Sequence, residues 1–157
     1  MLNLKNSKSE DDKTVLRLEE FLPYRLMVAA EKISLGFSKI YKEKYDLSRP
    51  EWRVLASLAQ FNRATATEVG AHSSMHKTKV SRAVYVLEKR KWLSRKMDDQ
   101  DRRVEWLELT REGKAKFSAL AKLAKAYEAQ IVTLLGEGSA AQLDAALARV
   151  EAVHIIV

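Results

Sequence analysis

The 157-residue sequence predicts a mainly α-helical fold that contains one small β-wing. Its five Gly and two Pro are too few for a loop-rich all-β protein, whereas Ala, Leu, Lys and Glu, which favour helices, are plentiful. Apolar residues recur at spacings of three and four along most of the chain, and this period changes only after Leu93. The length is typical of one domain with a substantial core.

The first predicted helix begins near Pro23, because proline is tolerated in the first turn of a helix, and it ends near Tyr45. One apolar seam follows its length, formed by Leu26, Ala30, Ile33, Phe37 and Ile40. Residues 1–14 are polar and charged, and we expect them to form a flexible N-terminal arm.

Two capping boxes predict the next helices. Ser48 with Glu51 begins a helix that carries Trp52, Leu55 and Leu58, and Thr65 with Glu68 begins a short helix. A basic helix follows Ser73-Ser74 and runs to about Arg90, with an apolar face of Val80, Ala83, Val84 and Leu87. Two short helices joined by a tight turn, the second one basic, indicate a helix-turn-helix.

A β-hairpin follows, with strands at 93–97 and 104–109 and a polar turn at 98–103. Leu107 and Leu109 should share its buried face. Thr110 then caps a long helix with the seam Phe117, Leu120, Ala124, Tyr127, Ile131 and Leu134. Gly136 and Gly138 should end this helix, and Ser139 with Gln142 should cap a last helix that bears Leu143, Leu147 and Val150.

The apolar seams near the two ends of the chain, together with the apolar tail 153–157, predict a homodimer. Burial of the same seams within one monomer is the alternative. We expect residues 15–47 and 114–157 to form the helical dimerisation region, and residues 48–113 to form a winged helix-turn-helix module.

Positive charge is concentrated in one segment of the sequence. The chain carries a net charge of +7, and residues 76–103 hold ten Lys or Arg against four acidic residues. A local basic patch is typical of a protein that binds a polyanion, most often nucleic acid. Charge alone leaves an ordinary solvated surface equally open.

Other classes of function find little support. The absence of cysteine removes disulfides and thiolate chemistry, and it favours a reducing cytoplasm. No leader and no apolar run long enough to cross a bilayer are evident, so we expect no membrane association. Catalytic signatures are missing, and we expect neither an enzyme nor a cofactor. His72 and His76 straddle a turn, so we expect no metal there; His154 should pack in the tail.

The order of elements resembles that of the MarR family of winged helix-turn-helix transcription regulators. The most specific similarity is DRRVEWLELTREG at residues 101–113, which fits the family pattern Asp-x-Arg followed by a strand ending in Leu-Thr-x-x-Gly. Residues 80–82 and 87–90 support it, and the resemblance covers about 20–153. The family usually has Gly where this chain has Lys91, so either Lys91 adopts a positive φ or the basic helix ends differently.

The resemblance implies a dimeric, double-stranded DNA-binding transcription regulator, most often a repressor, on a palindromic operator. The basic helix would enter the major groove, with Arg82 at a base or, alternatively, clamping a phosphate or pairing with Glu88 or another acid. The resemblance also implies that Arg103 enters the minor groove while Asp101 orients it; a solvated turn is the alternative. The expected DNA-binding residues are Ser74, His76, Lys77, Thr78, Lys79, Ser81, Arg82, Asp101, Arg102 and Arg103.

The same resemblance implies release by a small molecule, for which an aromatic carboxylate or an acyl thioester is the expected class. Its candidate contacts are Arg25, Phe37, Tyr41, Trp52 and Arg53, each of which is otherwise plain core or surface. A helical protein-interaction adaptor with a basic face is the alternative function. A steep salt dependence together with a dependence on DNA sequence would distinguish the regulator from the adaptor.

Overall fold

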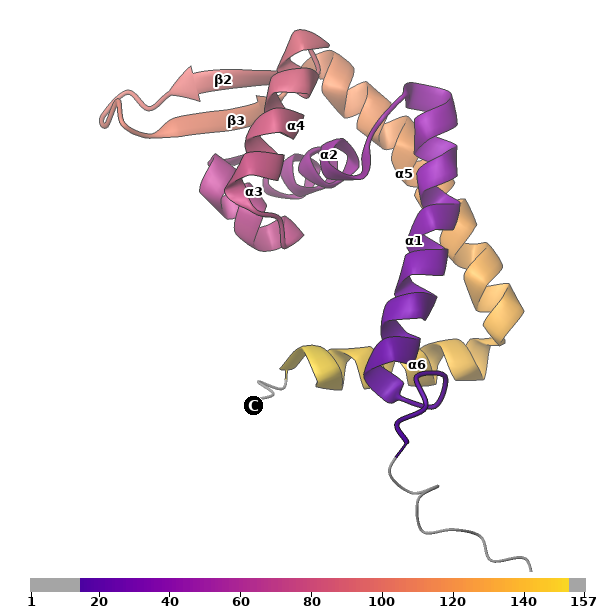
Figure 1. Ribbon diagram of the computed structural model, residues 1–157. Helices are drawn as coiled ribbons and strands as arrows, with labels where there is room; N and C mark the ends of the chain where they lie inside the picture. Colours follow the sequence, from indigo (N-terminus) through magenta and orange to yellow (C-terminus); the bar gives the residue numbers. More distant parts are fainter. Residues whose placement is uncertain (1–14, 153–157) are drawn as a thin grey trace, which may run out of the picture. The chain divides into compact units, whose positions relative to one another are not determined.

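The computed structural model describes residues 15–152, which contain six helices and three strands (Figure 1). The chain divides into two compact units at Gly36, and each unit is described by itself. The arm predicted at 1–14 and the tail at 153–157, with His154, lie outside the described residues. No helix within residues 15–152 is both long and apolar enough to cross a membrane.

The first unit holds most of helix α1 (Leu22–Tyr45), which begins one residue before Pro23 as the sequence predicts. Its apolar side chains are only partly covered by the chain itself. Met27 is 56% exposed and Ile33 42% exposed, although Ile33 belongs to the predicted seam.

The second unit contains the helix-turn-helix, formed by α2 (Arg49–Phe61), α3 (Ala66–Ser73) and α4 (Lys77–Lys89). Both predicted capping boxes are present. The backbone N–H of Ser48 donates to the Glu51 carboxylate at 3.0 Å, and that of Thr65 donates to Glu68 at 2.7 Å. The second bond, with a further one from the Thr65 hydroxyl, lowers the pKa of Glu68.

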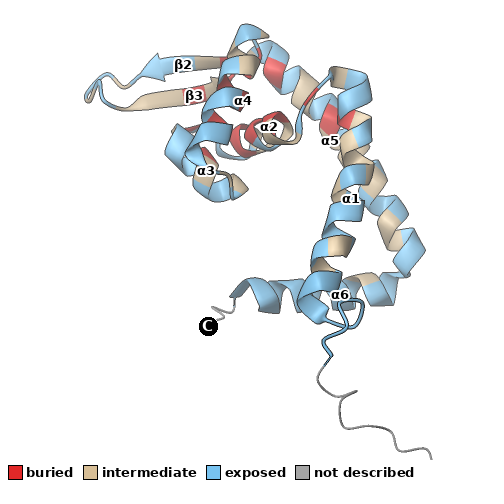
Figure 2. Cartoon of the chain, viewed as in Figure 1, coloured by how far each residue is buried: buried red, intermediate tan, exposed pale blue. Residues whose placement is uncertain are grey.

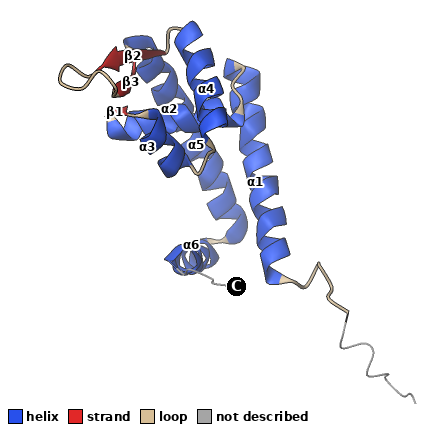
Figure 3. Ribbon diagram, turned by 60° about the vertical axis from the view of Figure 1, so that its left-hand side comes forward, coloured by secondary structure: helices blue, strands red, loops and turns tan. Residues whose placement is uncertain are grey.

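The wing is a three-stranded antiparallel sheet of order β1-β3-β2, made by β1 (Arg63–Ala64), β2 (Leu93–Met97) and β3 (Glu105–Leu109). The predicted hairpin and the burial of Leu107 and Leu109 are confirmed. The sequence analysis missed β1, which lies beside β3 in Figure 3. Two residues are too short to show an alternating pattern, so only their pairing with β3 defines them as a strand.

One hydrophobic core joins the helix-turn-helix to the wing. Leu55 of α2, Leu87 of α4 and Leu107 of β3 are completely buried. Figure 2 shows buried residues gathered where these elements meet. Burying each such side chain contributes roughly 1.5–3 kcal/mol, so the shared core fixes the wing relative to α4.

The long helix α5 (Arg111–Leu135) is followed by α6 (Glu137–Ala152). The predicted cap at Ser139 is wrong. Gly136, with a φ of 80°, ends α5, and its carbonyl already accepts the Ala140 N–H at 2.9 Å, so α6 begins at once and includes Gly138 and Ser139. The break needs only one residue because glycine accepts this φ without strain.

Candidate DNA-binding interface

Helix α4 presents a polar face opposite its core face. Val80, Ala83, Val84 and Leu87 are buried as the sequence predicts. The opposite face is exposed and consists of Lys77, Thr78, Ser81, Arg82 and Tyr85. Tyr85, which is 56% exposed, was missed by the sequence analysis because an aromatic residue within a helix suggests core.

His76, which is among the expected DNA-binding residues, caps α4. Its Nδ1 accepts the Thr78 backbone N–H at 3.4 Å, so this helix begins at Lys77. His72 has a different partner, since its Nδ1 lies 2.9 Å from the Ser57 hydroxyl and its ring packs on Phe61. The two histidines therefore do not act as a pair.

Ser74, which is among the expected DNA-binding residues, does not lie on the basic helix α4. Ser74 caps the end of α3 with a φ of 52°, and the Ser73 hydroxyl bonds back to the Val69 carbonyl, so these serines end one helix rather than begin the next. Ser74 nevertheless stays exposed in the turn before α4.

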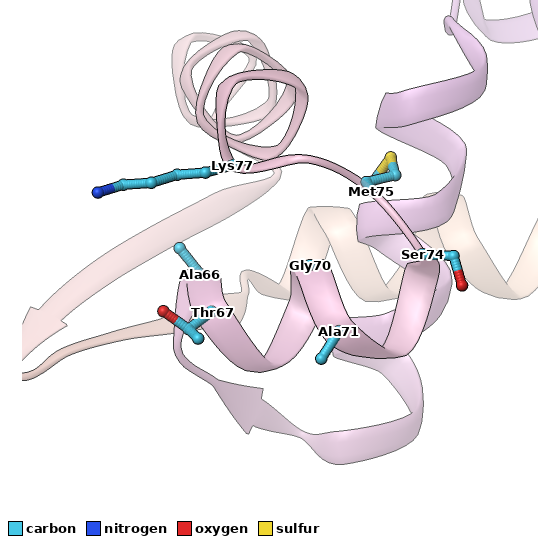
Figure 4. Close-up of a pocket in the computed structure, with 7 residues that line it drawn as sticks. All are labelled: Ala66, Thr67, Gly70, Ala71, Ser74, Met75 and Lys77. Carbon is cyan, nitrogen blue, oxygen red and sulfur yellow. The ribbon is translucent and has the colours of Figure 1, made fainter. Parts of the chain in front are cut away.

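A shallow groove lies between α3 and this turn, and Figure 4 shows the side chains around it. Small residues form most of its wall, and Lys77 extends from the start of α4 near Ala66. A Cβ on Gly70 would stand 3.1 Å from the Met75 carbonyl oxygen, so a small residue at position 70 lets the turn approach α3 closely. The groove residues are Ala66, Thr67, Gly70, Ala71, Ser74, Met75 and Lys77.

Ion pairs divide the basic residues of the module into two groups. Arg95 pairs with Glu88 at 3.0 Å and with Glu105 at 2.9 Å, and Lys96 pairs with Glu108 at 2.8 Å. Within the basic segment 76–103, the cations that have no acidic partner among residues 15–152 are Lys77, Lys79, Arg82, Lys89, Lys91 and Arg102.

This division bears on Arg82. Because Glu88 is engaged by Arg95, the predicted alternative of an Arg82–Glu88 pair is not formed. Arg82 thus has no ion-pair partner in the part of the chain that the structure describes.

At the tip of the wing, Arg103 is held by Asp101 as expected. The Asp101 Oδ1 accepts both the backbone N–H of Arg103 at 3.0 Å and its Nε–H at 3.2 Å. The Arg103 side chain is still 93% exposed. A surface pair of this kind contributes at most about 1 kcal/mol, so its main effect is to orient the guanidinium.

The conformation of Lys91 shows how the basic helix ends, which the sequence left open. It adopts a φ of 60°, and its N–H donates to the Glu88 carbonyl while the Trp92 N–H donates to that of Leu87. These two bonds form a Schellman motif, which glycine usually ends with less strain. The basic helix therefore ends as in the glycine-containing pattern.

Contacts at the point where α5 begins beside the end of α4 explain why the sequence Leu-Thr-x-x-Gly occurs at residues 109–113. The Thr110 hydroxyl donates to the Lys91 carbonyl at 2.7 Å and accepts the Gly113 N–H at 3.1 Å. A Cβ on Gly113 would lie 2.0 Å from the Trp92 carbonyl oxygen. Only glycine lets α5 begin this close to the end of α4.

Arg90 joins the end of α4 to the end of α1. Its guanidinium donates to the Tyr45 carbonyl at 2.7 Å and to the Asp46 carbonyl at 2.8 Å, and it lies 5.3 Å from the ring centre of Trp92. Unpaired carbonyls at a helix end are thereby satisfied. The sequence analysis missed this contact because its partners lie more than 40 residues away.

Three predicted effector contacts come together, but they fill one another's space. Phe37 lies with its ring centre 5.3 Å from Tyr41 and 5.2 Å from Trp52, and Tyr41 is only 2% exposed. Arg53 points elsewhere, donating to the Ser73 carbonyl at 3.5 Å. Arg25 lines a separate surface hollow of the first unit.

Comparison with known proteins agrees with this geometry. A family model described as MarR family matches residues 45–104, which include α2, α3, α4 and β2. The MarR family transcriptional regulator SPO1453 of Silicibacter pomeroyi DSS-3 is 27% identical, with a TM-score of 0.76 over 87% of this chain and 96% of that chain. Over residues 45–104 the chain is similar to the MarR family of transcription regulators, and it shares their fold.

Two further structures share the MarR fold at lower identity. BpsR of Bordetella bronchiseptica is 18% identical, with a TM-score of 0.80 over 89% of this chain and 99% of that chain. NadR is also 18% identical, with a TM-score of 0.72 over the same fractions. No curated protein sequence matches the chain.

These similarities point to a DNA-binding transcription regulator. They favour the regulator over the protein-interaction adaptor.

Proposed function

We propose that this protein acts, like MarR-family regulators, as a two-fold symmetric repressor on a palindromic operator. In each half-site α4 enters the major groove and the wing places Arg103 in the adjacent minor groove. The observation that carries the proposal is the set of cations left without acidic partners on α4, combined with an oriented, almost fully exposed arginine at the wing tip.

The side chains of α4 divide into base readers and phosphate binders. Arg82 has a planar guanidinium that can donate two parallel bonds to guanine, and it sits midway along the exposed face. Lys77 and Lys79 lie in the first turn, where compact ammonium groups suit phosphates. Ser81 and Thr78 offer hydroxyls to either partner.

The dimer interface is proposed at the two ends of the chain. The apolar seam of α6 is only partly covered within the described chain, since Leu143 is 39%, Leu147 40% and Val150 49% exposed. No residue of α6 is buried. Such a helix gains stability only when a second surface covers its apolar residues.

We propose an aromatic carboxylate as effector, with its acyl thioester as an alternative form. DNA binding by BpsR is regulated by 6-hydroxynicotinic acid, and NadR has been solved with 4-hydroxyphenylacetate. The rings of Phe37, Tyr41 and Trp52 would supply stacking partners once the cluster loosens, and Arg53 a positive charge. The ligand must bind one arrangement of the two α4 helices better than the other in order to act.

A comparison of three alanine variants tests the DNA-binding mode. Duplexes selected by the wild-type protein from a random pool serve as specific probes, and unselected duplexes as non-specific ones. Arg82→Ala should reduce discrimination between them by about 1–3 kcal/mol, because a base contact is lost. Lys79→Ala should weaken both equally and lower the salt slope by about one. Lys125→Ala, on the exposed side of α5, is the control.

Equal weakening of both probes by Arg82→Ala would make Arg82 a phosphate contact. Failure of the wild-type protein to enrich any sequence from the pool would contradict the proposal as a whole.

A further inference from the structure

We propose that Trp106 positions the DNA-contacting arginine of the wing by holding Asp98 through its indole N–H. The inference rests on the proposed minor-groove role of Arg103. It concerns a residue that touches no DNA itself and acts through the conformation of the turn at 98–103.

Asp98 is the centre on which this turn is folded. Its Oδ2 accepts the Trp106 indole N–H at 2.8 Å, while its Oδ1 accepts the backbone N–H groups of Gln100 at 2.9 Å and Asp101 at 3.0 Å. These bonds hold the pKa of Asp98 at about 2. The carboxylate therefore stays ionised and keeps all three donors at neutral pH.

A second carboxylate, that of Asp101, connects the folded turn to Arg103. Asp101, whose backbone is fixed by Asp98, binds both the backbone N–H and the Nε–H of Arg103. Backbone bonds of 2.9 Å close the turn from either side, one from the Asp98 N–H to the Val104 carbonyl and one from the Val104 N–H to the Asp101 carbonyl. Trp106 thus binds Asp98, Asp98 fixes the backbone of Asp101, and Asp101 binds the guanidinium of Arg103.

Trp106 is itself anchored to the helix-turn-helix. The guanidinium of Arg63 lies 4.7 Å from the centre of its ring, a distance typical of a cation–π contact. Arg63 belongs to β1, pairs with Glu108 in the sheet, and precedes the N-cap of α3 by two residues. The turn that carries Arg103 is therefore connected, contact by contact, to the start of α3.

The functional consequence is an ordered wing tip before DNA binds. An arginine on a mobile loop loses conformational entropy when it enters a groove, and this loss weakens binding. A turn that is already folded around Asp98 avoids most of that loss. Removing only the indole N–H should therefore weaken DNA binding while leaving every DNA-contacting side chain in place.

A double-mutant cycle tests the inference on a duplex selected from a random pool by the wild-type protein. Trp106→Phe retains an aromatic ring beneath Arg63 and removes the N–H donor. We expect Arg103→Ala to weaken affinity about tenfold or more and Trp106→Phe to weaken it about threefold to tenfold. In the Arg103→Ala background, Trp106→Phe should change affinity by less than about twofold, because its effect passes through the arginine.

Glu105→Gln is the matched control, because it breaks an ion pair with Arg95 on the same sheet and leaves Asp98 and Arg63 untouched. It should not weaken binding. Amide hydrogen exchange of residues 98–103 in the DNA-free protein gives a readout that does not depend on binding: Trp106→Phe should speed it and Glu105→Gln should not. Thermal melting of each variant verifies that the fold is retained.

The possible results distinguish the proposed minor-groove contact of Arg103 from the proposed positioning role of Trp106. If Arg103→Ala leaves affinity unchanged, the proposed minor-groove contact is wrong. If Arg103→Ala weakens binding but Trp106→Phe has no effect, or has the same effect in both backgrounds, the positioning role of Trp106 is overturned and the minor-groove contact stands.

Discussion

Replacing Gly113 by Ala should destabilise the protein strongly, although it adds a single methyl group. The new Cβ would lie 2.0 Å from the Trp92 carbonyl oxygen and 2.8 Å from its carbon. Both atoms belong to backbone, which cannot rotate away as a flexible side chain can. The start of α5 and the end of α4 must therefore separate by roughly 1 Å or more, a strain that costs about 1–3 kcal/mol.

The separation also stretches the bonds that join the two helices. The Thr110 N–H donates to the Trp92 carbonyl at 3.0 Å and the Thr110 hydroxyl to that of Lys91 at 2.7 Å, each contributing about 0.5–1.5 kcal/mol. Alanine returns about 0.5–1 kcal/mol through its higher helix propensity. The expected net loss in the free energy of unfolding is about 2–4 kcal/mol.

Urea denaturation followed by circular dichroism measures this loss, at one fixed protein concentration because dimer dissociation contributes to unfolding. Gly138→Ala is the matched control. A Cβ there meets nothing within 4 Å and lies in helix α6, so it should leave stability unchanged or slightly raised. A loss below about 0.5 kcal/mol for Gly113→Ala would refute the close approach of α5 to Trp92.

Four further outcomes are expected. Lys91→Gly should raise the free energy of unfolding in urea by about 0.5–1 kcal/mol, because glycine accepts the φ of 60° without strain, whereas Lys91→Ala should not. Arg90→Ala should lower it by about 1.5–3 kcal/mol, since charged hydrogen bonds to two backbone carbonyls are lost. Asp98 has a pKa of about 2 against an ordinary 3.8, so its ionised form stabilises the wing turn above pH 3.8, and this contribution should fade as the pH falls from 3.8 through 2. The chemical shift of the Trp106 indole N–H should follow that titration, and a midpoint near 3.8 would contradict the hydrogen bonds to the Asp98 carboxylate. Deleting residues 139–157 should yield monomers with weak DNA binding, and an unchanged dimer mass in sedimentation would refute the proposed interface.

Local chemistry predicted most of the helix starts and the hairpin. The boxes at Ser48 and Thr65 each involve residues three apart, so the sequence displays both partners of the bond. The alternation that buries Leu107 and Leu109 is likewise visible within one strand. Such short-range sequence patterns can be recognised without knowing which elements of the fold pack against one another.

Features that depend on distant partners were not predictable in the same way. Strand β1 exists only through its pairing with β3, more than 40 residues further along the chain. Ser139 satisfies the pattern of a cap, but Gly136 begins the helix earlier through its backbone conformation. At the candidate site, the sequence identified the cations of α4, whereas only the structure showed which of them have acidic partners.

Because Arg90 bonds the carbonyls of Tyr45 and Asp46 to the last turn of α4, we expect a movement of these two residues to tilt α4. A helix of 13 residues such as α4 is about 20 Å long, so a tilt of about 5° at the bonded end displaces the opposite end by nearly 2 Å. That displacement exceeds the tolerance of a hydrogen bond to a base edge. A small rotation at the bonded turns is thus enough to take the first turn of α4 out of register with an operator.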